Sequence, residues 1–235
     1  MAVPPAERDA AERTARAAAV ELEGATAQEI LTWAAKEFGR QICVAASMAD
    51  AVLIDLASKV MPGIDVVFLD TGYHFAETIG TRDAVAAVYP VTLHSILPKQ
   101  TIAEQDELFG PQLYSRDPDA CCNLRKVEPL RRALEPYRAW ANGIRRSETT
   151  NRREIGVVEW DGNRGLVKVN PIAAWTDDEV DAYIAENHVL VNPLVSEGYP
   201  SIGCAPCTRR VENGADPRSG RWAGSTKTEC GIHVT

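Results

Sequence analysis

The sequence lacks any uninterrupted run of about 18 apolar residues, the length that a membrane-spanning helix needs. Charged side chains also interrupt residues 1–20, which therefore lack the apolar core of a secretory signal peptide. Both absences predict a cytoplasmic protein with no membrane partner. An excess of basic residues is missing too, because 25 basic and 33 acidic side chains give a net charge of −8, which disfavours nucleic acid as a partner.

Two common nucleotide-binding motifs are absent. The chain has neither a G-x-G-x-x-G dinucleotide fingerprint nor a G-x-x-x-x-G-K-[ST] phosphate loop, so we expect a ligand with fewer phosphates than ATP. Internal repeats and low-complexity tracts are absent as well. With 235 residues and 45% hydrophobic content, the chain is long enough for one sizeable core. We expect one domain over residues 1–211, with peripheral N-terminal helices, and a polar, mobile tail over 212–235.

Short apolar segments alternate with helical ones along the chain. A capping box of Thr26 and Glu29, with Gly39 as the stop, predicts one helix, and a second box at Thr176 and Glu179 predicts another over 176–186. Strands are predicted at 42–46, 64–69, 91–94, 139–143, 156–160 and 166–169, and further helices at 49–60 and 75–88. The βαβαβ order predicts an α/β fold with a doubly wound, mainly parallel sheet.

Polar residues follow the first two predicted strands, at the edge where an open parallel sheet binds its ligands. The first loop contains Ser47 and Asp50, and Ser47 is expected to cap the next helix, to donate to an anion, or both. The second loop contains Leu69 and Thr71, in a position suited to a ribose and base. The sequence therefore predicts a nucleotide site at this edge.

Six cysteines in a reducing compartment indicate metal binding or catalysis more than disulfides. Cys121-Cys122 and the C-x-x-C pair Cys204 and Cys207 form a set of four, which favours an iron–sulfur or zinc site. Adjacent thiolates chelate one tetrahedral ion awkwardly, so a single 4Fe–4S cluster is preferred over zinc. A thioredoxin-like redox pair at 204–207 is the alternative, but it leaves Cys121-Cys122 unexplained. Cys43 lies in an apolar strand and is predicted to belong to the core.

Basic side chains gather after the cysteine pair, after a predicted strand and in the tail. They are Arg125, Lys126, Arg145, Arg146, Arg152, Arg153, Arg218 and Arg221. Guanidinium groups match phosphate and sulfate oxygens, although a solvated surface is the commoner role of any single one. Cys230, near the end of the sequence, is a candidate nucleophile whose thiolate a protonated His233 or the tail arginines would favour; an inert thiol is the alternative.

Together, the CC pair, the C-x-x-C motif and the terminal Glu-Cys-Gly-x-His resemble the assimilatory sulfonucleotide reductase family, in its adenylyl-sulfate branch, from about residue 41 to 233. The resemblance implies a fold similar to the adenine-nucleotide alpha-hydrolases, or ATP pyrophosphatases. It implies nucleotide recognition at 69–71 and phosphate binding near Ser47, a 4Fe–4S cluster on the four motif cysteines, and nucleophilic attack by Cys230. The further substrate contacts that it implies are Asp50, Lys126, Gly143, one of Arg152 and Arg153, Arg218, Arg221 and His233.

The activity implied is reduction of adenylyl sulfate to sulfite and AMP, through an S-sulfocysteine, in assimilatory sulfate reduction. Reduced thioredoxin or a glutaredoxin-like dithiol would donate the electrons. The alternatives are a 3′-phosphoadenylyl-sulfate reductase, an iron–sulfur redox sensor and an ATP-dependent iron–sulfur sulfurtransferase. A sensor would need neither a terminal cysteine nor nucleotide loops. Met48 and Ala49 stand where an ATP pyrophosphatase has glycines, which argues against the sulfurtransferase.

Overall fold

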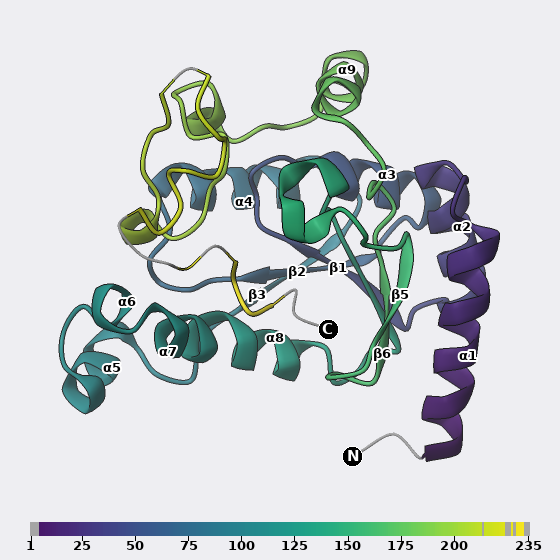
Figure 1. Ribbon diagram of the computed structural model, residues 1–235, viewed down its shortest axis with the longest axis horizontal. Helices are drawn as coiled ribbons and strands as arrows, with labels where there is room; N and C mark the ends of the chain where they lie inside the picture. Colours follow the sequence, from purple (N-terminus) through teal and green to yellow (C-terminus); the bar gives the residue numbers. More distant parts are fainter. Residues whose placement is uncertain (1–4, 213, 224–226, 228, 233–235) are drawn as a thin grey trace.

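A six-stranded sheet forms the centre of the computed structural model, with helices on both of its faces (Figure 1). The structure describes residues 5–212, 214–223, 227 and 229–232. The strand order is β3-β2-β1-β4-β6-β5, in which β5 runs antiparallel to β6 and the other neighbours pair in parallel. The strands are β1 (Ile42–Ala46), β2 (Asp65–Leu69), β3 (Thr92–Ile96), β4 (Ala139–Asn142), β5 (Val158–Asp161) and β6 (Leu166–Val169). The predicted α/β class and mainly parallel sheet are confirmed.

The helices divide between the two faces and one end of the sheet. Helices α3 (Val52–Val60), α4 (Ala76–Val88) and α9 (Asp177–Asn187) lie on one side, and α5 (Ile102–Phe109), α6 (Leu113–Arg116), α7 (Pro118–Cys122) and α8 (Glu128–Ala133) on the other (Figure 1). Helix α1 (Pro5–Glu21) packs along β5 and β6, and α2 (Ala27–Phe38) packs on α3. Short 3-10 turns span Arg146–Glu148, Thr150–Arg152, Pro193–Val195 and Ala205–Cys207. None of the helices described is long and apolar enough to cross a membrane.

Capping boxes determine where several helices begin. The predicted boxes at Thr26 and Thr176 are confirmed, and a further one at Thr101 begins α5. In each box the threonine hydroxyl accepts from a backbone N–H three residues on, while the glutamate there accepts from the threonine N–H. Cys43 is fully buried in β1, as predicted, because it lies in the apolar layer between the sheet and α8.

The loop after β1 differs from the prediction. Helix α3 begins at Val52, and the Asp50 carboxylate accepts a 3.0 Å hydrogen bond from the Val52 amide. Ser47 is exposed and lies five residues before the helix, so the expectation that it caps this helix is wrong. Met48 explains why α3 begins later than predicted. Its φ of 63° turns the chain sharply, while its side chain is fully buried in the core. That turn separates Ser47 from the helix.

The C-terminal segment folds back over the carboxyl edge of the sheet and then runs toward α7 and α8 (Figure 1). Its first part is tied to the domain by backbone hydrogen bonds from Arg209 N to Gly220 O and from Val211 N to Gly198 O, both 2.9 Å. The described part of the tail is therefore docked on the domain. The predicted division at residue 212 and the predicted mobility of the tail stay predictions.

Candidate active site

Four cysteines from two distant parts of the chain line one pocket. Cys121 and Cys122 end α7, whereas Cys204 precedes and Cys207 ends a 3-10 turn that lines the same pocket. Thr71, from the predicted nucleotide loop, joins them: its hydroxyl oxygen lies 3.3 Å from the Cys204 sulfur. The two cysteine pairs and the nucleotide loop predicted from the sequence are thus neighbours.

The chemistry of this pocket fits an iron–sulfur cluster. Burial, reinforced by the charges of Cys204 and Cys207, raises the pKa of Cys121 to about 11, so the thiolates here need a compensating cation. Within the described residues, no three His, Cys, Asp or Glu side chains are arranged to share one metal ion. A tetranuclear cluster gives each thiolate its own iron, so its four ligands surround a cavity instead of meeting at a point. The four cysteines match that donor set.

A π-helical turn, Asn123–Val127, follows the cysteine pair directly and places Lys126 against the same pocket. Such turns are rare and frequent at functional sites. Burial acts to lower the pKa of Lys126, but the sulfurs of Cys204 and Cys230 raise it more, and the net shift is upward. Lys126 therefore remains a cation beside the sulfur atoms.

Arg125, on the same turn, is committed to internal contacts. It is 3% exposed, and its Nε donates to the Gln105 side-chain oxygen at 2.8 Å. Its Nη1 donates to the Thr71 carbonyl at 2.9 Å, and its guanidinium lies 4.9 Å from the Tyr73 ring centre. Arg125 thus connects the nucleotide loop to the cysteine helix, a role that the sequence did not reveal.

The loop after β2 is held by polar contacts around its backbone. His74 Nε2 lies 2.8 Å from the Leu69 carbonyl oxygen, and burial lowers the pKa of this imidazole. Gly72 N donates to Asp70 at 3.1 Å, which closes the turn, and Thr71 is fully buried beneath it. The loop is therefore fixed in place before any ligand binds.

Cys230 is buried beside the cysteine pair. It packs against Cys122 and Trp222 and is 7% exposed. Its sulfur interacts with that of Cys122, and the positive charge of Lys126 acts to lower the pKa of Cys230 while burial acts to raise it. These contacts favour the thiolate, the reactive form of cysteine.

Glu229, the residue before Cys230, was not among the candidates from the sequence. Its carboxylate accepts two hydrogen bonds from Arg152, from Nε at 2.9 Å and from Nη2 at 2.8 Å. Arg218 Nη2 donates to the same carboxylate at 3.2 Å. The sequence did contain one signal for this contact. An acidic residue stands directly before Cys230, and the chain has several arginines without an assigned partner.

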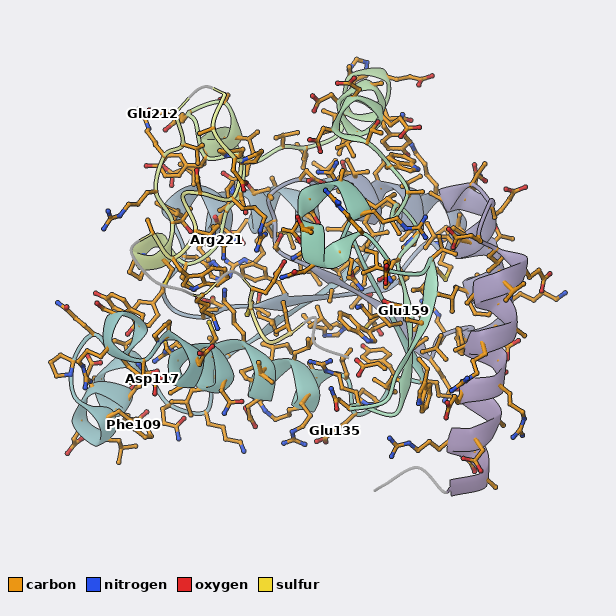
Figure 2. The ribbon with its side chains drawn as sticks, viewed as in Figure 1. Phe109, Asp117, Glu135, Glu159, Glu212 and Arg221 are labelled. Carbon is orange, nitrogen blue, oxygen red and sulfur yellow. The ribbon has the colours of Figure 1, made fainter. Side chains whose placement is uncertain are left out.

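The remaining site residues predicted from the sequence lie in different parts of the structure. Arg221 lies in the C-terminal segment, between Glu212 and Asp117 in the view of Figure 2, with its guanidinium 4.6 Å from the Trp222 ring centre. Ser47 and Gly143 are exposed just after the neighbouring strands β1 and β4. Asp50 caps α3, and burial raises the pKa of its carboxyl. Arg153 is exposed, in contrast to the buried Arg152. His233 lies outside the described residues.

Residues 41–210 match the model of the phosphoadenosine phosphosulfate reductase domain. The chain belongs to this family. It is 59% identical over 228 residues to the adenosine 5′-phosphosulfate reductase of Mycolicibacterium smegmatis, covering 97% of this chain and 95% of the relative. The enzyme of the same name from Streptomyces coelicolor is also 59% identical, over 95% of this chain and 93% of its own length. The resemblance carried by the cysteine motifs is confirmed.

Solved structures agree with this family assignment. The phosphoadenylyl-sulfate reductase of Candida auris, in its phosphate complex, superposes with a TM-score of 0.70 at 30% identity, over 90% of this chain and 99% of that one. The FMN adenylyltransferase of Candida glabrata gives a TM-score of 0.55 at 16% identity, over 81% of this chain and 65% of that one. The second likeness concerns the fold alone. With the family match and the first likeness, the predicted adenine-nucleotide alpha-hydrolase-like fold is confirmed.

Proposed function

We propose that this member of the family reduces adenylyl sulfate to sulfite and AMP, as an oxidoreductase acting on sulfur groups in sulfate assimilation. The observation that carries the proposal is the position of Cys230, docked beside Lys126 at the pocket of the four cysteines. The names of the relatives from Mycolicibacterium smegmatis and Streptomyces coelicolor support adenylyl sulfate as the substrate.

In the first step the Cys230 thiolate attacks the sulfur of adenylyl sulfate. A bond forms between the cysteine sulfur and the sulfate sulfur, the bond from that sulfur to the bridging phosphate oxygen breaks, and AMP leaves with the electron pair. Lys126 lines the pocket and Arg221 interacts electrostatically with Cys230, and both cations would stabilise the charge that develops on the phosphate. Cys230 is left as an S-sulfocysteine.

In the second step a dithiol such as reduced thioredoxin, or a glutaredoxin-like protein, supplies two electrons. One of its thiolates attacks the sulfur of Cys230, and sulfite leaves with the electron pair of the broken bond. The second thiol then resolves the mixed disulfide and restores Cys230. Because Cys230 is only 7% exposed in the docked tail, this step requires the tail to move outward.

Cys121, Cys122, Cys204 and Cys207 would hold one 4Fe–4S cluster. Bound there, the cluster would compensate part of the charge of the four thiolates and would join α7 to the 204–207 turn. Because the dithiol supplies both electrons, the reaction would require no redox change of the cluster. The six cysteines are unpaired, which suits a reducing compartment such as the cytoplasm.

The test is intact-protein mass after anaerobic incubation of the cluster-loaded protein, without reductant, with adenylyl sulfate or its 3′-phosphorylated form. We expect a sulfonate adduct on Cys230, formed faster from adenylyl sulfate. A faster reaction with the phosphorylated nucleotide would assign the protein to the other substrate. Cys230→Ser should abolish the adduct and keep the cluster absorbance, whereas Cys43→Ala, at a buried cysteine of β1, should keep both; loss of the cluster in the Cys230 variant would contradict the division of roles.

A further inference from the structure

The carboxylate of Glu229 joins the tail to the domain next to the nucleophile, and Lys227 adds an ion pair with Asp119 of α7. Both Glu229 oxygens receive hydrogen bonds from Arg152, and one also receives a bond from Arg218. The Thr149 hydroxyl lies 3.5 Å from the same carboxylate. We call Glu229, Arg152 and Arg218 the tail anchor. Two hydrogen bonds between one guanidinium and one carboxylate make a stronger and more specific contact than a single one.

Arg152 is largely occupied by protein carboxylates. Its Nε and Nη2 bind Glu229, and its Nη1 donates to Glu148. The Arg152 side chain is 9% exposed, so little of the guanidinium is open to a substrate while the tail is docked. The arginine that the resemblance assigned to the substrate therefore contacts the tail in this structure.

The tail anchor has a direct consequence for Cys230. Consecutive Cα atoms are about 3.8 Å apart, so fixing the Glu229 side chain fixes the backbone of the nucleophile as well. Among the described residues, Lys227 also pairs with Asp119, and Cys230 itself packs against Cys122 and Trp222. A nucleophile that is already held in the reactive position reacts far faster than one on a loose segment, which must first diffuse there.

The tail anchor is also able to open. The Glu229 side chain is 21% exposed and that of Arg218 is 15% exposed, which is intermediate between a surface ion pair and a fully buried one. Water can therefore replace part of the contact when the tail leaves. This suits a segment that must be docked for attack on the substrate and undocked for reduction.

We propose that Glu229 is a positioning residue for Cys230, and that Arg152 and Arg218 are its receptor on the docked tail. The proposal rests on the proposed function in one respect, namely that Cys230 is the nucleophile. It goes beyond that function because it gives Arg152 and Arg218 a partner on the tail, the carboxylate of Glu229. It also predicts that the strength of the tail anchor determines the fraction of time that Cys230 spends docked at the pocket.

The first test measures how fast iodoacetamide alkylates Cys230 in the cluster-loaded protein, by intact mass and peptide mapping. The variants are Glu229→Gln and Arg152→Gln, with Glu212→Gln, an exposed acid earlier in the tail, as the matched control. Losing a hydrogen-bonded charge pair should raise the alkylation rate about tenfold in both variants. A purely electrostatic effect on the thiolate would move the two variants in opposite directions, because one loses a negative and the other a positive charge.

The second test measures single-turnover formation of the Cys230 adduct from adenylyl sulfate. We expect a rate about tenfold lower in Glu229→Gln and Arg152→Gln, and no further loss in the double variant, because both act on one contact. The dissociation constant of adenylyl sulfate, measured in a Cys230→Ser background, should change less than about threefold on adding Glu229→Gln. Cluster absorbance and the urea midpoint report whether each variant is folded, and Arg218→Gln replaces Arg152→Gln if that variant is not.

Three outcomes would overturn the proposal: an unchanged alkylation rate in folded Glu229→Gln, opposite effects in the two variants, or a large loss of adenylyl sulfate affinity on changing Glu229. Failure of the proposed function has a different signature, because the unmodified protein would then form no adduct at all. The alkylation comparison remains informative in that case, since it reports docking of the tail independently of turnover.

Discussion

Gly203 precedes the first cysteine of the C-x-x-C motif and lies under the guanidinium of Arg221. A β-carbon at Gly203 would lie 2.6 Å from Arg221 Cζ and 3.1 Å from Nε, and closer still to Nη2. Arg221 has little freedom to withdraw, because its Nη1 donates to the Ile202 carbonyl at 3.2 Å and its guanidinium lies over the Trp222 ring. Gly203→Ala should therefore displace the guanidinium by about 1 Å, the difference from an ordinary contact distance of about 3.5–4 Å.

The expected cost of Gly203→Ala is mainly catalytic. Overpacking of a partly flexible neighbour should lower the free energy of unfolding by about 1 kcal/mol, whereas a misplacement of about 1 Å in the site can cost about 100-fold in kcat/KM. Steady-state sulfite release and urea denaturation measure the two quantities. Gly24→Ala, where a β-carbon meets nothing within 4 Å, is the matched control.

A double-variant cycle decides whether Arg221 transmits the effect of Gly203→Ala. In an Arg221→Ala background the clash is absent, so adding Gly203→Ala should leave kcat/KM within about threefold of Arg221→Ala alone. If Gly203→Ala still costs about 100-fold there, the reasoning from the Arg221 contact is refuted.

Further predictions concern stability and are measured by denaturation. Gly80, inside α4, has open space around its Cα, so Gly80→Ala should raise the free energy of unfolding by about 0.5–1 kcal/mol; a decrease would contradict the open geometry. Gln105→Leu should lower it by about 2 kcal/mol, because Arg125 Nε would lose its acceptor inside the protein, and an unchanged midpoint would refute this. Backbone hydrogen bonds lower the pKa of the capping-box glutamates below 4.5, so their contribution is complete above that pH and is lost as the pH falls through the lowered values. Replacing Glu29, Glu104 and Glu179 by glutamine should flatten the acid limb of the stability–pH curve, and an unchanged limb would exclude them as its cause.

Much of the fold could be predicted from local signals. Strands β1 and β6 have the predicted bounds, and the boxes at Thr26 and Thr176 begin their helices where expected. Alternation of apolar strands and amphipathic helices is a property of neighbouring residues, so it can be read along the chain. The start of α3 was missed, because the left-handed turn at Met48 depends on a buried side chain and on core packing that no local pattern reveals.

The cysteine motifs and their spacing identified the family and named the cysteines of the pocket and the proposed nucleophile, because the chemistry of cysteine is a property of the residue itself. The roles of the arginines were different. Eight basic candidates look alike in the sequence, and only the packed chain separates the internal Arg125, the exposed Arg153 and Arg152, whose nitrogens face carboxylates. A guanidinium takes its role from the nearest oxyanion, and the carboxylate of Glu229 reaches Arg152 from 77 residues away in the chain. Contacts across such a separation exist only once the sheet, its loops and the docked tail have brought the two segments together.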